Sequence, residues 1–336
     1  MSQKALLLDE VGKPLIVGDR PIPQPGKNQL LVKVLVAGLN PHDQRTRDAG
    51  LFVTSMPYVL ANDLVGEVVT AGNGEYSAKF TLGERVFAQQ YALVDATFVG
   101  RVASSGLSDD EASTIPVIVL AGFIALFASS GHGLPPPFSP EAKSFDFASV
   151  TLLVIGGGSN TGRAVVELAK LAGIGRIIAV AGHHNQANLK SIGATHFIDR
   201  RAPDAQDQIR AITGDELVYA VDTVNAGVKQ ELGVAALSNT KKVTLITFRR
   251  PDGDFDTARI GSKSVGYERR LVLGVSPMHP DVAMGFWEEV PRWFKEGKIR
   301  PSSFEVIKGL NADAVNKALG QYRDGKGAKM NIHPWE

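Results

Sequence analysis

The sequence predicts an α/β protein in which a small β-barrel precedes a doubly wound parallel sheet. Three observations support this prediction. Short apolar segments separated by glycine and proline fill residues 1 to about 115, and strand and helix patterns alternate after residue 150. A glycine-rich loop joins the first strand of this second region to its helix. At ~100–200 residues per domain, the 336 residues fit two domains.

The first region has the rhythm of a small barrel. Residues 29–37 are β-branched and apolar, and they follow a turn at residues 25–28. A second strand at residues 64–69 ends in a glycine-rich turn, and another strand begins at residues 83–88. Short strands at this spacing are typical of a barrel.

The second region has the rhythm of a parallel sheet. Residues 151–155 form a continuous apolar run, as a strand buried on both faces requires. Similar runs recur at residues 175–181, 217–222 and 241–247, and a helical stretch between the first two ends at Gly173. Strands alternating with helices predict a doubly wound parallel sheet.

Composition excludes several classes of protein. The chain is 44% hydrophobic and 21% charged with a net charge of +1, too balanced for a nucleic-acid binder that neutralises phosphates. The longest apolar run, residues 115–128, falls short of the ~20 residues that span a bilayer. The first residues turn charged too early for a secretory signal. We therefore expect a cytoplasmic protein with neither nucleic acid nor membrane as partner.

The chain contains no cysteine. This excludes disulfides, iron–sulfur clusters, thiol catalysis and every cysteine-ligated zinc site.

The glycine loop predicts a dinucleotide site. Gly156 permits a tight turn, Gly158 lets the backbone approach a pyrophosphate, and Gly162 lets the helix pack closely against the strand. Ser159, Asn160 and Thr161 complete the loop, and the helix N-terminus offers N–H groups to phosphates.

The end of the next strand favours NADP(H) over NAD(H). An NAD site usually places Asp or Glu there to bind the ribose hydroxyls, but this chain has no carboxylate at that point. Arg200 and Arg201, just after a strand expected at residues 195–199, are candidate counter-charges for a 2′-phosphate. The remaining cofactor-binding residues that we assign are Gly182, His183, His184, Asn185, Phe248 and Gly274.

With the loop in place, the order of motifs resembles the medium-chain dehydrogenase/reductase superfamily. Within it, the chain is most similar to zinc-independent quinone oxidoreductases and fungal trans-acting enoyl reductases of polyketide pathways. The segments that carry the resemblance are residues 38–43, 57–69, 82–86, 156–162, 191–195 and 323–326. The resemblance implies a GroES-like domain of residues 1–117 and 288–336, a Rossmann domain of residues 118–287, and a cofactor in the cleft between them.

The chain departs from the zinc enzymes of this superfamily at two ligand positions. Asn40 stands where they carry the first metal cysteine, and Asn62 stands where they carry a histidine. Neutral amides do not replace thiolate and imidazole as zinc ligands, so we expect no metal site. Reduction of a conjugated C=C bond does not need a Lewis acid, because hydrogen-bond donors stabilise the enolate.

Three residues are candidates for catalysis. The resemblance places Asn40 beside the nicotinamide, and Arg45 stands where the fungal enzymes often have Lys. Tyr58 precedes the former zinc motif and is a candidate proton donor. A surface role for Arg45 and a core-packing role for Tyr58 remain open alternatives.

The resulting hypothesis is an NADPH-dependent reductase of an enone or enoyl thioester. An NADPH quinone oxidoreductase and a non-catalytic NADPH-binding or sensor protein stay open as alternatives. The substrate is a small molecule, with a polyketide synthase or carrier protein as a candidate partner. A monomer and a homodimer are both compatible with the sequence.

Overall fold

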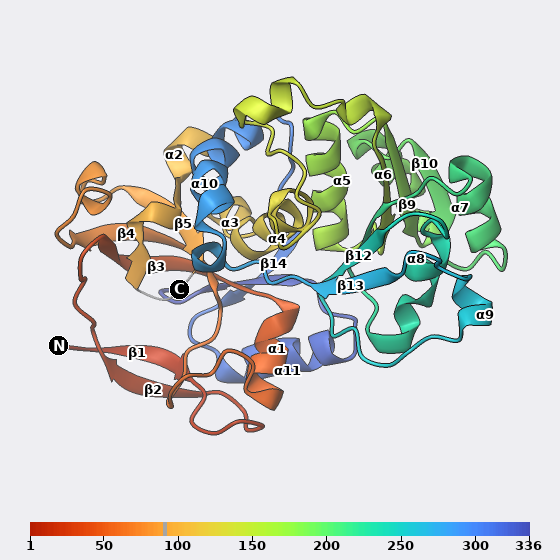
Figure 1. The fold of residues 1–336 in the computed structure, drawn as a ribbon. Coiled ribbons are helices and arrows are strands. Elements are labelled where there is room, and N and C mark those ends of the chain that lie inside the picture. Colours follow the sequence, from red (N-terminus) through yellow and green to blue (C-terminus); the bar gives the residue numbers. More distant parts are fainter. Residues whose placement is uncertain (90–92) are drawn as a thin grey trace. The chain divides into compact units, whose positions relative to one another are not determined.

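The computed structural model describes residues 1–89 and 93–336 and divides the chain into two compact units (Figure 1). The first unit joins both ends of the chain, Met1–Val117 and Met284–Glu336. The second unit is Ile118–Ala283. The chain passes between the units within helices α4 (Pro116–Phe127) and α10 (Pro280–Lys295).

The first unit is built on a seven-stranded sheet in the order β14-β15-β3-β4-β5-β7, with β6 paired to β3. The pairs from β15 to β7 are antiparallel, whereas β14 and β15 are parallel. Its strands are β3 (Gln29–Leu39), β4 (Asp63–Ala71), β5 (Arg85–Gln89), β6 (Leu93–Asp95), β7 (Val99–Arg101), β14 (Phe304–Lys308) and β15 (Lys329–His333). A separate hairpin consists of β1 (Ser2–Leu7) and β2 (Ile16–Pro21).

Pairing within this sheet brings the end of the chain to its beginning. Strand β15 runs beside β3 with Met330 opposite Leu39, while Gly38 on the other side of β3 faces Asp63 of β4. The α-helices that lie wholly within this unit are α1 (Pro41–Ala49), α2 (Val102–Ser105), α3 (Asp109–Ala112) and α11 (Ala312–Arg323). Helices α1 and α11 lie side by side (Figure 1). The carboxyl end of β3 and the start of β4 are therefore held from both ends of the chain.

The second unit is a six-stranded parallel sheet in the order β10-β9-β8-β11-β12-β13. Its strands are β8 (Thr151–Ile155), β9 (Arg176–Ala181), β10 (His196–Asp199), β11 (Tyr219–Asp222), β12 (Val243–Thr247) and β13 (Tyr267–Leu271). The connecting helices are α5 (Asn160–Ala172), α6 (Gln186–Ile192), α7 (Ala205–Thr213), α8 (Glu231–Ala236) and α9 (Thr257–Ile260). This order confirms the predicted doubly wound fold, and it reverses between β8 and β11, where such sheets bind ligands.

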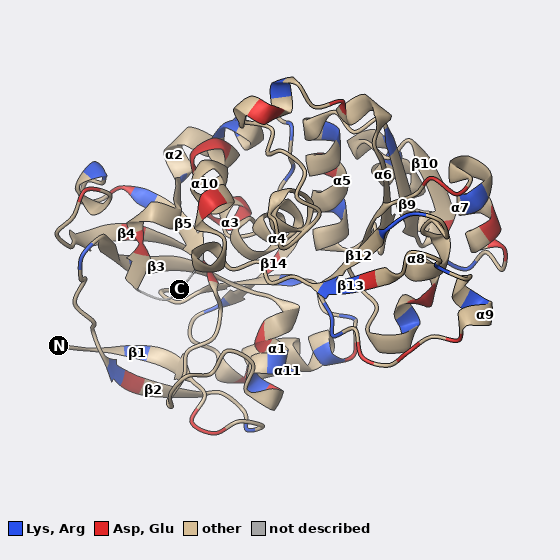
Figure 2. Cartoon of the chain, viewed as in Figure 1, with Lys and Arg blue, Asp and Glu red and all other residues tan. Residues whose placement is uncertain are grey.

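Apolar residues on the strands fill the core of this sheet. Leu152, Leu153 and Val154 of β8 are fully buried, as the continuous apolar run predicts. Charged residues of both signs are interspersed on helices such as α7 and α10 (Figure 2).

One apolar helical stretch, Asp109–Phe127, is long enough to cross a membrane by length and composition alone. Its most apolar window is 83% buried inside the protein, as in the core helix of a globular fold. The stretch therefore carries no argument for a membrane span.

Candidate active site

The glycine loop between β8 and α5 has the geometry that its sequence predicts. Gly156 has a φ of +75°, which favours glycine. A side chain at Gly162 would collide with the carbonyl oxygen of Gly156, so the helix can approach the strand only because this residue is glycine. The N–H of Gly162 donates to Oγ of Ser159 over 2.9 Å, which caps the helix. The loop thus fits the pyrophosphate of a dinucleotide.

Thr223, just after β11, fixes this loop. Its Oγ1 lies 3.1 Å from the carbonyl oxygen of Ile155, 3.0 Å from that of Gly156 and 2.9 Å from Oγ of Ser159. The sequence analysis did not identify Thr223. A polar residue at the carboxyl end of a parallel strand next to the glycine loop is the signal that would have identified it.

The residues predicted after β9 gather beside the glycine loop. A Cβ built on Gly158 would lie 2.5 Å from Nδ2 of Asn185, so the Asn185 amide packs directly over the loop. Nε2 of His184 lies 3.0 Å from the same Nδ2. The second strand and the loop therefore contribute to one surface.

Arg200 joins this group from the end of β10. Its backbone N–H donates to the carbonyl oxygen of Ala181 over 2.9 Å, and its Nε lies 3.9 Å from a Cβ built on Gly182. His183 is exposed, and its Nδ1 lies 3.9 Å from Oδ2 of Asp199. The region thus presents two exposed arginines, Arg200 and Arg201, and two exposed histidines, with one carboxylate facing a histidine.

The other assigned cofactor residues lie in the same unit. The side chain of Asn160 accepts a hydrogen bond from Arg163, whose other terminal nitrogen donates to the carbonyl oxygen of Gly158 over 3.3 Å. Burial lowers the pKa of Arg163. Thr161 and Phe248 are half-buried, and Gly274 lies against the backbone of Ala121.

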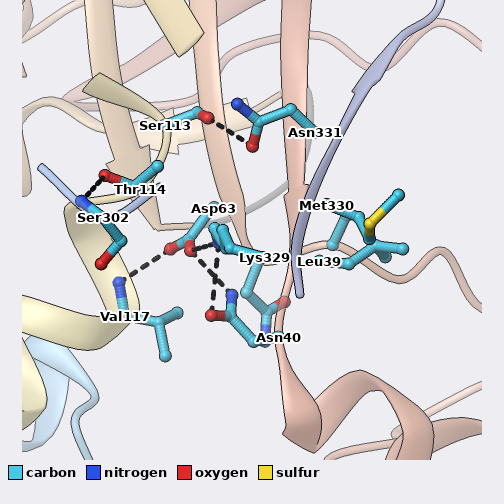
Figure 3. Close-up of polar contacts among 12 residues, drawn as sticks. Leu39, Asn40, Asp63, Ser113, Thr114, Val117, Ser302, Lys329, Met330 and Asn331 are labelled. Carbon is cyan, nitrogen blue, oxygen red and sulfur yellow. Dashed lines mark hydrogen bonds and ion pairs between the residues drawn. The ribbon is translucent and has the colours of Figure 1, made fainter. Parts of the chain in front are cut away.

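In the first unit, Asn40 belongs to a buried polar network (Figure 3). Lys329 Nζ lies 2.5 Å from Oδ2 of Asp63, and these side chains are 1% and 0% exposed. Nδ2 of Asn40 donates to the same Oδ2 over 2.7 Å, and Lys329 Nζ donates to Oδ1 of Asn40 over 3.3 Å. The other oxygen of Asp63 accepts from the N–H of Val117 over 2.7 Å.

A second carboxylate fixes the backbone around this network. Oδ2 of Asp43 accepts from the N–H of Asn40 over 2.7 Å, where α1 begins, and its Oδ1 accepts from the N–H of Ala61 over 2.9 Å. Asn62 follows at once, and its Nδ2 lies 2.9 Å from Nε2 of His42. Asn40 and Asn62, the two positions that the resemblance aligns with zinc ligands of other members, are thus both held at this end of β3 and β4.

Arg45 and Tyr58 lie near by in sequence but outside this network. Arg45 is half-buried on α1, and no described residue forms an ion pair with it. Tyr58 is half-buried against an apolar cluster that includes Leu8, and its backbone pairs with that of Leu8. Among residues 1–89 and 93–336, no group of three His, Cys, Asp or Glu side chains is arranged to hold a metal ion.

The fold and the glycine loop define a dinucleotide-binding protein. Residues 26–119 match the family model of the alcohol dehydrogenase GroES-like domain, and residues 161–283 match that of the zinc-binding dehydrogenases. The chain belongs to the medium-chain dehydrogenase/reductase superfamily. It is an oxidoreductase with a nicotinamide dinucleotide cofactor.

Individual relatives cover nearly the whole chain. A trans-enoyl reductase of Penicillium oxalicum, opdC, is 28% identical over 97% of this chain and 94% of its own length. The CurK enoyl reductase superposes with a TM-score of 0.74 at 18% identity, covering 98% of each chain. A mycobacterial quinone oxidoreductase superposes with a TM-score of 0.73 at 20% identity, covering 98% of this chain and 99% of its own. These two structures support the fold alone.

Proposed function

We propose that the protein is an NADPH-dependent reductase of conjugated C=C bonds, acting on an enone or an enoyl thioester. The observation that carries the proposal is the seating of Lys329 against Asp63 and Asn40. The ammonium group of Lys329 already donates to Oδ1 of Asn40 and Oδ2 of Asp63. These oxygens are therefore engaged, and the site contributes hydrogen-bond donors to catalysis. The similarity to a trans-enoyl reductase supports the same reaction.

NADPH is the cofactor that the residues after β9 and β10 fit. Arg200, His183 and His184 offer nitrogen donors beside Gly182, and no carboxylate follows β9 directly. A 2′-phosphate gains charge-assisted hydrogen bonds from such donors, whereas Asp or Glu at this place would repel it. When bound, NADPH supplies a hydride to the β-carbon of the substrate.

The first unit supplies the groups that stabilise the resulting enolate. Arg45 carries a permanent charge, and Tyr58 a hydroxyl donor. Nδ2 of Asn40 has two hydrogens, of which one is donated to Asp63, and we assign the second to the enolate oxygen. Losing one donor that acts mainly on the transition state costs ~10²–10³ in rate. An enoyl thioester held by a polyketide synthase or carrier protein is a substrate of the same chemistry.

Deuterium transfer tests the reaction. The protein is incubated with NADPH deuterated at the transferable position and with a panel of enones, enoyl thioesters and quinones. The proposal expects deuterium at the β-carbon of at least one enone or thioester. It is overturned if no tested enone or thioester acquires the label while quinones are consumed, which would favour a quinone oxidoreductase. Binding of NADPH with no turnover would favour a sensor.

Cofactor titration tests the choice of NADPH. We expect NADPH to bind ~10–100-fold more tightly than NADH, because one charge-assisted contact to a phosphate contributes ~1.5–3 kcal/mol. Arg200→Ala should remove much of this preference. Arg176→Ala is the matched control, because Arg176 is also exposed but lies at the amino end of β9, at the opposite edge of the parallel sheet. Equal affinities of the unsubstituted protein for both cofactors, measured by fluorescence titration, would contradict the choice.

A further inference from the structure

His42 stands at the second residue of α1, and three neighbours hold its imidazole. Nδ2 of Asn62 lies 2.9 Å from Nε2, and Oδ1 of Asp43 lies 3.7 Å from the same nitrogen. The ring of Phe52 meets the imidazole edge to face, with 6.1 Å between centroids. The side chain remains 17% exposed. The ring is therefore fixed in place yet reachable from outside.

The second ring nitrogen is available for chemistry. None of the described residues forms a hydrogen bond with Nδ1 of His42. The amide of Asn62 can present either its NH₂ or its oxygen to Nε2, since rotation about one bond exchanges them. Its oxygen can accept from Nε2–H both in the imidazolium and in the neutral ring that is left when Nδ1 has given up its proton. One neighbour thus satisfies the ring in both states while Nδ1 gives and takes a proton.

The location of His42 connects it to the proposed reaction. His42 lies two residues after Asn40, and its hydrogen-bond partner Asn62 directly precedes Asp63, which accepts from Asn40. The asparagine amide does not ionise near neutral pH, whereas imidazole does, so the histidine is the side chain suited to transfer a proton. Proton transfer by a positioned acid contributes ~10²–10⁴-fold to rate.

We propose that His42 is the acid that completes the reduction, an inference that rests on the function proposed above. Hydride addition at the β-carbon breaks the C=C π bond and leaves an enolate. The proton on Nδ1 of His42 then moves to the α-carbon, where the enolate electron pair forms the new C–H bond and the carbonyl is restored. The imidazole is left neutral and regains its proton from water. Since the ring is fixed, the proton arrives on one face of the α-carbon.

The configuration at the α-carbon tests this assignment. An α-methyl enoyl thioester is reduced with NADPH in D₂O by the unsubstituted protein and by His42→Gln, which keeps an amide beside Asn62. The unsubstituted protein should give one α-configuration carrying solvent deuterium. His42→Gln should give a mixture of configurations and a kcat at least tenfold lower. The KM for NADPH should stay unchanged, because the substitution removes a proton donor and leaves the cofactor-binding unit intact.

His333→Gln is the matched control. Its side chain is 19% exposed, it belongs to the same unit, and its ring bonds to Asp110 and Glu336. This variant should keep both the rate and the single configuration. The assignment is overturned if His42→Gln retains the single α-configuration and the kcat of the unsubstituted protein. The proposed function fails separately, if the unsubstituted protein itself reduces no enone or thioester.

Discussion

Each unit buries ionisable side chains, and a few examples show two different ways of accommodating the charge. The first unit buries a carboxylate and an ammonium together, because Asp63 and Lys329 are in contact and almost inaccessible to water. In the second unit His132 is half-buried and Asp222 is fully buried, and no described residue places a counter-ion in contact with either of them. Nε2 of His132 donates to the carbonyl oxygen of Ala220 over 3.0 Å, and burial lowers its pKa to about 4.

Burial also shifts the pKa of Asp222 toward the neutral form, but for an acid this means a raised pKa. Burial raises the pKa of its carboxyl group, although the N–H groups of Val224 and Asn225 donate to it. Burial disfavours the charged form of any group that lacks an opposite charge. The opposite charge therefore offsets the desolvation of Asp63 and Lys329, whereas His132 and Asp222 are shifted toward their neutral forms.

The largest expected change in the free energy of unfolding comes from breaking the ion pair of Asp63 and Lys329. Asp63→Asn leaves the ammonium of Lys329 buried without its counter-charge, so the free energy of unfolding should fall by ~3–5 kcal/mol. Denaturant unfolding of the variant measures this loss. The double variant Asp63→Asn with Lys329→Met should recover most of it, since the unpaired charge is then gone.

An exposed pair in the same unit provides the control. Lys4 and Asp19 lie 2.6 Å apart with both side chains 61% exposed. Asp19→Asn should change the free energy of unfolding by less than ~1 kcal/mol. If Asp63→Asn lowered the free energy of unfolding by no more than Asp19→Asn does, burial would not make the pair of Asp63 and Lys329 more important for stability than an exposed pair.

The second prediction uses pH to test the neutral histidine. The pKa of His132 in the folded protein, about 4, lies below the ordinary value of 6.5. The unfolded chain therefore binds a proton that the folded protein does not between these values. Stability should fall as pH is lowered from 6.5 to 4, by up to about 1.4 kcal/mol per pH unit. Unfolding curves across this range measure the slope.

Two variants isolate the contribution of this histidine. His132→Gln retains an N–H donor for Ala220 and should reduce the slope. His196→Gln changes a half-buried histidine on β10 and should leave the slope as it was. Equal slopes for the unsubstituted protein and His132→Gln would rule out titration of His132 as the cause.

The two units also differ in how much of their sites could be predicted from the sequence. The glycine loop is a local feature, because one short segment between a strand and a helix determines both the turn and the approach of α5. The loop and its fold were therefore predictable. Asp63 and Lys329 are 266 residues apart and meet only because β15 pairs with β3. No local pattern identifies such partners. The contact between His42 and Asn62 spans 20 residues and depends instead on the pairing of β3 with β4.

Thr223 is an intermediate case. It follows β11 directly, and the strand itself was predicted from its apolar residues. Its role depends on β11 lying next to β8 in the sheet. Strand order is a tertiary property, but the reversal typical of doubly wound sheets makes that neighbour predictable once the fold is assigned. Sequence reasoning therefore reaches residues at strand ends more readily than side chains paired across a sheet.

The smallest expected change in the free energy of unfolding comes from replacing the buried aspartate of the second unit by asparagine. Asp222→Asn replaces a carboxyl group already biased toward its neutral form, and Oδ1 still accepts from the N–H groups of Val224 and Asn225. The new NH₂ faces Nδ2 of Asn225, whose amide must turn to accept from it. We expect a loss of ~1 kcal/mol or less at neutral pH.

The pH dependence of this variant gives the sharper measurement. Because the pKa of Asp222 is raised in the folded protein, its stabilising contribution is present at low pH and is lost as pH rises through that pKa. Asp222→Asn should therefore compare more favourably with the unsubstituted protein at neutral pH than at pH 4. Asp63→Asn, measured alongside, should remain strongly destabilising at neutral pH. Equal losses for the two variants at neutral pH would break the contrast, since Asp222 would then act as a charged group with a partner of its own.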